Sequence, residues 1–396
     1  MVVDAGLLAA EMLLVAFAGG ALGAAIGGYA AYGLAGLVIT AGEISRLALG
    51  PGGNDLLVEN ATASVSGAAN GTASAGINAT ATAGINATGL IGYGPALGPH
   101  VAFAGGVAAA AFAGRKGYLA TSYWYHEAKH VTTALGTRPD VLLVGGVFGV
   151  VGYWLAQLSV RFALPWDPVA ASVVLSALLH RTVFGYPLIG KLGTGLLDMS
   201  PFERGDRRGG GQPSNGGQTP ASGPENGQGS GPENGQGSGQ QGSAGPTGRL
   251  TVEPWLPHQY RWANVAVLGA VVGTFGGFIA VATGSFALAF GIAAVALLLP
   301  VAGVDRAPIV HHMAFPAGIA ALALPGADPT VAILVGGAFG LFGGVAGELA
   351  QRVFYAHADT HFDPPSASML VTTATIAVLD VAGVFTQTVV PTGALG

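Results

Sequence analysis

Cysteine is absent from the 396-residue chain, and charged residues make up only 9% of it. Without thiols the chain can form no disulfide, no cysteine-ligated zinc site and no iron–sulfur cluster. Soluble domains carry about a quarter of their residues as Asp, Glu, Lys or Arg, so this shortage of charge indicates a protein whose main solvent is not water. The net charge of −5 is thinly spread and no basic block occurs, which argues against a nucleic-acid partner.

Apolar residues take the place of the missing charges. The chain is 51% hydrophobic, contains 67 glycines and has a mean hydropathy of +0.56. Long apolar runs recur along its whole length, which predicts a polytopic protein embedded in a lipid bilayer. The abundance of Ala, Gly and Val, together with the lack of cysteine, resembles the composition of haloarchaeal membrane proteins.

Ten apolar segments, five in each half, are expected to form an all-α bundle of transmembrane helices. They cover residues 7–29, 31–49, 90–113, 141–162, 168–184, 262–279, 285–301, 307–324, 330–354 and 365–384. Several are shorter than the roughly 20 residues that cross a bilayer. The second span, with Glu43 and Arg46, and the third and eighth, with His100 and His312, are therefore candidates for broken or re-entrant segments.

The two halves of the chain match each other. The stretch "LVGGVFGVVGYWLAQLSVR" from Leu143 aligns without a gap with "LVGGAFGLFGGVAGELAQR" from Leu334. In the same order, "HVAFAGGVAAAA" from His100 matches "HMAFPAGIAALA" from His312. Repeated matches in one order predict an internal duplication.

Two further matches support the duplication. "GALGAAIGGYAA" from Gly20 resembles "GAVVGTFGGFIA" from Gly269 more loosely, and "WDPVAAS" and "FDPPSAS" pair Asp167 with Asp363. Because each copy holds an odd number of spans, the second copy must lie upside down relative to the first. We therefore predict two inverted five-helix repeats; a re-entrant third span would instead make the two copies parallel.

The domain boundaries follow from the same pattern. Residues 1–200 are expected to form the first membrane repeat and residues 258–396 the second. Residues 201–257 contain "SGPENGQG" twice and almost nothing apolar, which predicts a disordered linker. The first repeat carries a low-complexity outer loop at 50–89 and a cytoplasmic interfacial insertion at 115–138.

Glycosylation signals set the predicted orientation. All four Asn-x-Ser/Thr sequons, at Asn60, Asn70, Asn78 and Asn86, fall within the 50–89 loop, which predicts a glycosylated outer surface. With this loop outside, most Lys and Arg residues lie inside, as the positive-inside rule expects. We predict a multi-pass plasma-membrane protein with both termini outside and the linker in the cytoplasm.

Ionisable groups inside apolar spans are the predicted transport path, because lipid excludes them unless they face a cavity or a partner. His100 and His312 hold matching places, as do Gln157 and Glu348 near the ends of their spans. Asp380 is expected deep in the tenth span, with no basic residue nearby in sequence. We expect these five side chains to line a polar route between the repeats, along which a small solute or ion moves.

One motif suggests an enzyme instead. "HEAKH" on a helix would place His126 and His130 on one face, with Glu127 as the general base for a zinc-bound water. "GTRPD" follows and ends at Asp140. Together these 15 residues resemble the HExxH and GTxxD elements of zincin and aspzincin metalloproteases. The resemblance implies a zinc ion held by the two histidines and Asp140, with Glu127 catalytic.

Other features of the same segment point elsewhere. Lys129 places a cation where the metal would bind, and the second repeat has no counterpart of the segment. The Tyr- and Trp-rich stretch 118–135 predicts a helix at the cytoplasmic interface. A non-catalytic divalent-metal site shared with His357, Asp359 and His361 of "HADTHFD" is a further alternative.

Three hypotheses therefore stand after the sequence alone. The leading one is a transporter or channel-like protein without a resident cofactor. The alternatives are a membrane-embedded zinc metalloprotease and a structural or interaction protein of the cell envelope. Each is compatible with a homo-oligomer.

Overall fold

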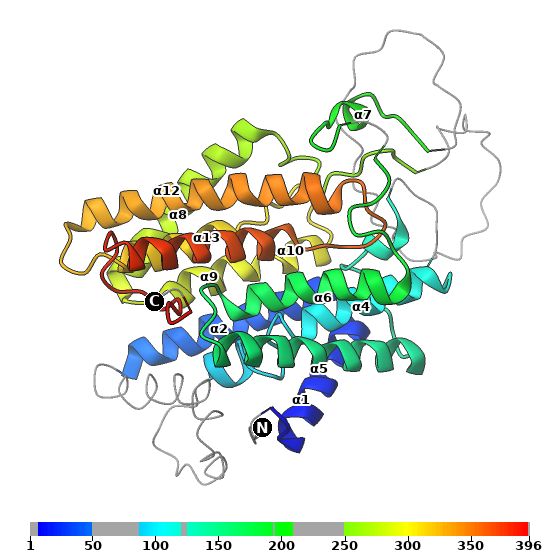
Figure 1. Ribbon diagram of the computed structural model, residues 1–396, viewed down its shortest axis with the longest axis horizontal. Coiled ribbons are helices and arrows are strands. Elements are labelled where there is room, and N and C mark those ends of the chain that lie inside the picture. Colours follow the sequence, from blue (N-terminus) through cyan, green and yellow to red (C-terminus); the bar gives the residue numbers. More distant parts are fainter. Residues whose placement is uncertain (1–6, 50–86, 120–124, 193–194, 209–248, 395–396) are drawn as a thin grey trace.

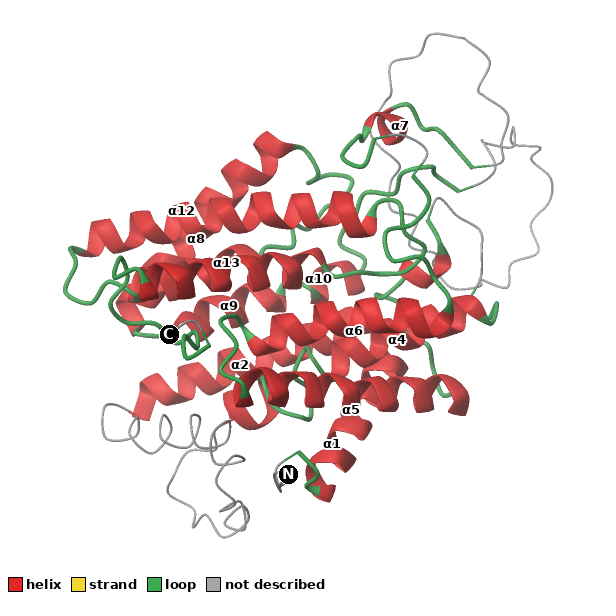
Figure 2. Cartoon of the chain, in the orientation of Figure 1, coloured by secondary structure: helices red, strands yellow, loops and turns green. Residues whose placement is uncertain are grey.

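The computed structural model describes residues 7–49, 87–119, 125–192, 195–208 and 249–394, and this part of the chain is helical (Figures 1 and 2). Within it, the β-type pairing is confined to one isolated antiparallel bridge between Arg207 and Leu250. The predicted all-α class is therefore confirmed. The predicted sequons at Asn60, Asn70, Asn78 and Asn86 lie outside the described residues, as does most of the predicted linker.

Eleven helices build the described bundle. They are α1 (Ala10–Ile26), α2 (Gly28–Leu49), α4 (Ala102–Arg115), α5 (Pro139–Arg161), α6 (Pro168–Phe184), α8 (Trp262–Thr283), α9 (Phe286–Val295), α10 (Leu298–Val301), α11 (His311–Leu322), α12 (Pro329–Ala350) and α13 (Pro364–Val381). The short α7 (Ser200–Glu203) lies beyond one end of the bundle (Figure 1). Shorter turns are η2 (Thr88–Gly92), η3 (Glu127–Lys129) and η4 (Gln351–Tyr355).

Among the described residues, four helical stretches are long and apolar enough to cross a membrane: α5, α8, α12 with η4, and α13. In contrast, α4 and α11 have only 14 and 12 residues. At 1.5 Å per residue they extend about 21 and 18 Å, well short of a hydrocarbon core of about 30 Å. Both are buried along nearly their whole length. They are half-length helices enclosed by their neighbours.

The same packing arrangement occurs twice among these helices. In the first half α1 packs on α5, α4 contacts both, and α6 contacts α4 and α5. In the second half α8 packs on α12, α11 contacts both, and α13 contacts α11 and α12. The helices α2 and α9 take corresponding places, each against the first and the half-length helix of its own half. Helices that match in sequence therefore also match in packing.

Glycines bring the first and fourth helices of each half into backbone contact. A Cβ atom added to Gly20 of α1 would lie 2.7 Å from the Cα of Gly149 in α5. One added to Gly273 of α8 would lie 2.7 Å from the Cα of Gly340 in α12. Small residues allow this close approach of helices. By these contacts Gly20 corresponds to Gly273. The looser sequence match pairs Gly20 with Gly269, which lies one helical turn before Gly273.

The half-length helices begin partway along their neighbours. The carbonyl oxygen of His100, just before α4, lies against Gly152 in the middle of α5. The carbonyl oxygen of His312, in the first turn of α11, lies against Gly343 of α12. The aligned sequences pair Gly152 with Gly343, so the two contacts are equivalent. The third and eighth predicted spans are thus interrupted, whereas α2, also a candidate for a break, is continuous.

Corresponding helices of the two halves meet in antiparallel pairs. Along α2 and α9, an added Cβ on Gly36 would meet Val295, and one on Gly291 would meet Thr40. Along α6 and α13, the backbone N–H of Asp167 donates to Thr373 Oγ1 in the middle of α13, at 2.9 Å. The start of α13 in turn shares a cavity with the middle of α6. The helices α2 and α9 therefore run in opposite directions along each other. The helices α6 and α13 each begin beside the middle of the other.

The segment between α4 and α5 differs from the prediction. In place of a helix over 118–135, its described residues hold only the 3₁₀ turn η3. The carbonyl of Val131 accepts from the N–H of Tyr29 at 3.0 Å, and the N–H of Leu135 donates to Ala24 at 3.2 Å. The backbone groups that a helix would pair internally are used here to attach the segment to the junction of α1 and α2.

Substitution of Gly152 by alanine tests the close packing. The new methyl group would press on the His100 carbonyl, which is backbone and cannot rotate away. We expect Gly152→Ala to lower the free energy of unfolding by about 1–3 kcal/mol, measured by thermal unfolding of the purified protein in detergent. Val147→Ala, at a 47% exposed position of the same helix, is the control. Equal losses of unfolding free energy in Gly152→Ala and Val147→Ala would contradict the close packing of Gly152 against the His100 carbonyl.

Candidate functional site

Buried polar side chains collect where the half-length helices begin. His311 and His312 form the first turn of α11, and each is 1% exposed. Asp363 precedes α13 at 2% exposure, and His361 is fully buried two residues earlier. Tyr32, near the start of the first half's α2, is 1% exposed and completes the group. We call these five residues the polar centre.

The members of the polar centre lie close to one another. The ring of Tyr32 is 4.8 Å from that of His311, and the two adjacent imidazoles are 5.9 Å apart between centroids. Nε2 of His361 lies 3.6 Å from one carboxylate oxygen of Asp363. His311 also interacts electrostatically with that carboxylate. Residues from α2, α11 and the start of α13 therefore form one site that joins the two halves.

Local structure fixes the position of Asp363. Its second carboxylate oxygen accepts from the backbone N–H of Ser366 at 2.9 Å and from the Ser366 hydroxyl at 2.5 Å. Asp before Pro is a favourable helix start, since the side chain caps free N–H groups and proline fits the first turn. Asp167 caps α6 in the same way, accepting from the N–H of Ala170 at 2.6 Å. The cap at Asp363 leaves its other oxygen facing His361.

Several polar atoms of the centre have no hydrogen-bond partner among the described residues. They are both ring nitrogens of His311 and of His361, Nδ1 of His312 and the hydroxyl of Tyr32. The ring of Phe103 packs against Tyr32 and His361 and helps to enclose them. An unpartnered buried polar group costs stability, and ionisable groups inside a membrane bundle mark functional sites by default.

A cavity adjoins the polar centre at His312. Its volume is only about 10 Å³, and it is also lined by Glu348, Gln351 and Gln259. The Glu348 carboxylate accepts from Arg352 Nε at 2.5 Å and from Gln351 Nε2 at 3.0 Å. Two of the five predicted path residues, His312 and Glu348, thus face one cavity.

The other three predicted path residues lie apart from this cavity. His100 is buried, with its ring beside Gly98 of the loop that leads to α4. Gln157 is half-buried on α5. Asp380 is not deep within a span as predicted, because α13 ends one residue later and the side chain is partly exposed. At 1.5 Å per residue it lies about 25 Å along the helix from Asp363.

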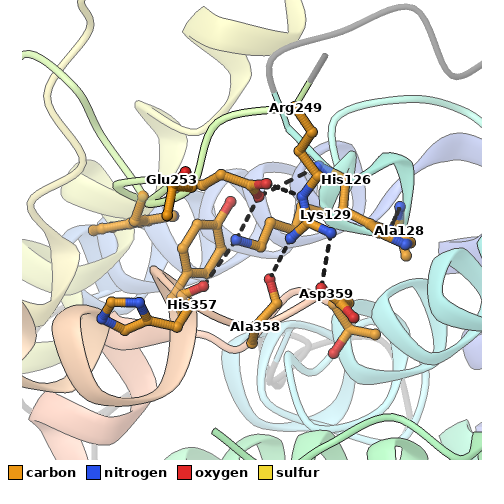
Figure 3. A network of polar contacts seen from close by, with 12 residues as sticks. His126, Ala128, Lys129, Arg249, Glu253, His357, Ala358 and Asp359 are labelled. Atoms are coloured by element: carbon orange, nitrogen blue, oxygen red, sulfur yellow. Dashed lines mark hydrogen bonds and ion pairs between the residues drawn. The ribbon is translucent and has the colours of Figure 1, made fainter. Parts of the chain in front are cut away.

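A second polar cluster lies at one end of the bundle (Figure 3). Lys129 Nζ is 2.7 Å from the Glu253 carboxylate, and these side chains are 1% and 0% exposed. The same ammonium donates to the carbonyl of Tyr355 at 2.8 Å and stands 4.3 Å above its ring. Arg249 pairs with Glu253 and, at 2.8 Å, with Asp359. We call these five residues the Lys129 network.

The Lys129 network explains the "HEAKH" motif. His126 and His130 flank a 3₁₀ turn, so they do not lie one turn apart on an α-helical face, and the helix implied by the zincin resemblance is wrong. Lys129, a position that the protease pattern does not use, points into the protein. Glu127 belongs to the turn itself, and Asp140 accepts from the hydroxyl of Tyr118 at 2.8 Å near the start of α5.

The remaining predicted metal ligands have other neighbours. Nε2 of His357 lies 3.0 Å from the carbonyl oxygen of Leu196, Asp359 pairs with Arg249, and His361 faces Asp363. Across the described ranges, no group of three or more His, Asp or Glu is arranged to hold a metal ion. The residues present therefore do not assemble the site that the protease and metal hypotheses require.

Burial changes the acid–base behaviour of the Lys129 network. It lowers the pKa of Lys129 to about 7, and repulsion by Arg249 adds to this, although the Glu253 charge acts in the opposite direction. Burial raises the pKa of Asp359, but the charge of Arg249 and its hydrogen bond outweigh burial and leave that pKa below its ordinary value. Lys129 thus changes charge near neutral pH.

Sequence reasoning missed two members of the polar centre. Tyr32 belongs to no motif and lies in an ordinary apolar span, so no local signal marks it. His311 is adjacent to the matched His312, but its aligned position in the first half is Pro99, and comparison of the repeats overlooks it. The available signal was two successive ionisable residues at the start of an apolar segment. Asp363 was recognised only as the repeat counterpart of Asp167.

Comparison with known proteins gives one match. A family profile described as "Family of unknown function (DUF7973)" covers residues 2–393, and so includes both halves and the segment between them. No curated protein and no solved structure matches the chain.

The pKa of Lys129 predicts how stability depends on pH. An unfolded lysine keeps its proton up to about pH 10.4, whereas folded Lys129 releases it near pH 7. Between these values the unfolded chain binds more protons, so the folded state gains stability as the pH rises. We expect the difference in unfolding free energy between wild type and Lys129→Met to increase from pH 7 to 9, by at most about 1.4 kcal/mol per unit.

Thermal unfolding in detergent at several pH values measures this difference. Lys116→Met, which removes an exposed lysine from the same connecting segment, is the control and should follow the wild type at every pH. Parallel curves for wild type and Lys129→Met would show that Lys129 keeps its ordinary pKa.

Proposed function

The chain belongs to this family of unknown function, and we propose that it is an integral membrane transporter or channel-like protein built from two inverted five-helix repeats. A small solute or ion would move through the polar centre between them. The observation that carries the proposal is the pair of half-length helices, α4 and α11, which begin beside equivalent glycines with buried histidines at their starts. Transporters build midplane sites from interrupted helices of this kind.

The repeated packing supports two copies of one unit, at residues 1–200 and 258–396. All five spans of one copy have a counterpart with the same neighbours in the other. The equivalent contacts of Gly152 with His100 and of Gly343 with His312 extend this agreement to single residues. Shared membrane composition alone would not reproduce a contact at aligned positions.

The antiparallel pairs favour an inverted over a parallel duplication. A twofold axis along the membrane normal would place α2 parallel to α9, and α6 parallel to α13. An axis within the membrane plane makes each pair antiparallel. The contacts of Gly36 with Val295 and of Gly291 with Thr40, and the bond from Asp167 to Thr373, fit the second arrangement.

The Lys129 network supports the predicted orientation. Its members come from the segment between α4 and α5, from the stretch before α8 and from the chain that follows α12. These are the segments expected in the cytoplasm with the predicted linker at 201–257, and they meet at one end of the bundle. The sequon loop at 50–89 and both termini would then lie outside.

The proposed route combines the cavity and the polar centre. His312 and Glu348 face the cavity, and Tyr32, His311 and Asp363 continue from it toward the junction of the halves. His100, at the matching position of the first half, would take the place of His312 when the opposite side opens. Gln157 and Asp380 would line the outer parts of the route.

Cysteine labelling tests the inverted arrangement, and the absence of native cysteine makes the chain a ready background. Thr137 precedes α5 and Thr330 lies in the first turn of α12, and both are exposed. Because α5 and α12 are aligned, an inverted duplication places Thr137→Cys and Thr330→Cys on opposite membrane faces. A membrane-impermeant thiol reagent applied to intact cells should label only one of them. Labelling of both from the same face would indicate parallel repeats.

Transport by alternating access predicts two-sided exposure of the route. Ser368 is fully buried, and its hydroxyl donates to the carbonyl of Gly343 at 2.6 Å, beside the cavity. We expect Ser368→Cys to react with an impermeant thiol reagent applied from either face of oriented vesicles. Ala109→Cys, fully buried among apolar residues of α4, should remain unlabelled. If Ser368→Cys is reached from one face only or from neither, the transport proposal fails.

A further inference from the structure

We propose that two buried polar contacts are the gates of this route, one at each end, and that both gates are closed in this structure. The inner gate is the ion pair of Lys129 and Glu253, and the outer gate is the contact of Glu43 with Ser285. The inference rests on the proposed function and specifies what closes the route on each side. Each gate joins the first half to the second half or to the stretch directly before it, so movement of one half against the other opens or closes it.

The inner gate is a buried ion pair at the end of the bundle that carries the Lys129 network (Figure 3). The ammonium of Lys129, on the segment between α4 and α5, lies 2.7 Å from the Glu253 carboxylate. The same ammonium donates to the carbonyl of Tyr355, at the end of η4, at 2.8 Å. The backbone N–H of Glu253 donates to the carbonyl of Ala356 at 2.9 Å, which fixes Glu253 against the same turn. The pair therefore fastens the first half to the end of η4.

A layer of aromatic rings connects the inner gate to the polar centre. The Lys129 ammonium stands 4.3 Å above the ring of Tyr355, and that ring is 5.4 Å from the ring of His361 between centroids. The ring of Trp255 lies 6.1 Å from that of His312. A single layer of rings thus separates the gate from the histidines of the polar centre, so opening of the gate gives water access to them from this end.

The outer gate is a second buried polar contact, between the far part of α2 and the start of α9. Glu43 is 7% exposed and Ser285 is 4% exposed. The Ser285 hydroxyl donates to one Glu43 carboxylate oxygen at 2.6 Å, and Arg46 Nε donates to the same oxygen at 2.9 Å. The Ser285 hydroxyl also caps α9 by accepting from the N–H of Leu288 at 3.0 Å. The contact therefore holds the start of a second-half helix against a first-half helix.

The course of α2 places the two gates on opposite sides of the polar centre. Tyr29, in the first turn of α2, accepts from Nε1 of Trp255, which follows Glu253 by two residues, at 2.7 Å. Tyr32 belongs to the polar centre and Glu43 to the outer gate. At 1.5 Å per residue, Tyr29 lies about 5 Å from Tyr32 along the helix axis, and Glu43 lies about 17 Å from it in the other direction. The polar centre is therefore enclosed between the two gates.

The space between the gates is small in this conformation. The cavity at His312 has a volume of about 10 Å³, which is room for about one water molecule. The rings of Phe103 and Phe290 pack on Tyr32 at 5.3 and 6.3 Å between centroids. A solute therefore reaches the polar centre only after one gate opens and the halves move apart on that side.

Polar contacts suit a gate because water can replace the partner that each group loses. When Lys129 separates from Glu253, hydration of both charges offsets much of their lost attraction. The Ser285 hydroxyl and the Glu43 carboxylate are likewise solvated when they separate. An apolar closure would instead expose hydrophobic surface on opening, which is unfavourable.

Labelling of Ser368→Cys in gate variants tests the proposal. The full-length protein is placed in oriented vesicles, and the impermeant thiol reagent is applied to one face at a time. Lys129→Ala removes the ammonium of the inner gate, and Glu253→Gln keeps the shape of its partner but removes the opposing charge. Ser285→Asp keeps a good cap for α9 and places a second carboxylate against that of Glu43.

Matched controls make the same kinds of change outside the gates. Lys116→Ala removes an exposed lysine of the segment between α4 and α5, and Ser45→Asp introduces a carboxylate at an exposed position of α2. With either control, Ser368→Cys should be labelled from each face at the same rate as without it.

We expect each inner-gate variant to raise the labelling rate about tenfold or more, and only from the face on which Thr137→Cys is labelled. Ser285→Asp should raise it by about the same factor, and only from the face on which Thr330→Cys is labelled. A gate variant that behaves like its control, or that speeds labelling from both faces or from the wrong face, would overturn the gates.

Failure of the gates is distinguishable from failure of the transport proposal. If Ser368→Cys is labelled from both faces and the gate variants change neither rate, the gates are wrong and the transport proposal stands. If Ser368→Cys without a gate variant is reached from one face only or from neither, the transport proposal fails, and the gates that rest on it fail as well.

Discussion

Backbone contact between glycine-bearing helices is the constraint on which the rest of this structure depends. Lipid supplies no hydrophobic force between helices, so close packing must hold the bundle together. The contacts of Gly20 with Gly149 and of Gly273 with Gly340 bring α1 onto α5 and α8 onto α12. The half-length helices α4 and α11 are then wedged against these pairs, with carbonyl groups resting on Gly152 and Gly343. Side chains at these glycines would push the starts of both half-length helices out of place.

The polar centre follows from that packing. Half-length helices that start inside the bundle bring their first turns, with His311 and His312, to the junction of the halves. The Asp-Pro start of α13 brings Asp363 there, whereas the Asp-Pro start of α6 lies beside the middle of α13, since these helices are antiparallel. Tyr32 meets His311 there because the start of α2 lies at the same junction. The position of the polar centre is thus set by where helices begin, and only secondarily by which residues they carry.

Sequence patterns predicted the helical class and most helix positions, because long apolar runs have few alternatives to helices in lipid. They also predicted the interruptions at His100 and His312, where proline and glycine precede ionisable residues. They failed where tertiary contacts decide. The stretch around "HEAKH" is bound to α1 and α2 through its backbone and so does not form a helix. Asp380 was placed deep in a span because the apolar run continues to Val384, although Gly383, with φ +74°, marks the end of α13. Tyr32 gains its significance only from neighbours that are distant in sequence.

The buried pair of Lys129 and Glu253 connects a segment of the first half to a residue that precedes the second half. If one half moves relative to the other, Lys129 and Glu253 either move together or are separated. A separated, solvated lysine binds its proton more tightly than buried Lys129, whose pKa is about 7. The separated arrangement therefore holds more protons at and above neutral pH, and by thermodynamic linkage acidification on that side favours it. The equilibrium between the paired and the separated arrangement therefore depends on pH, and it does so through a residue pair outside the polar centre.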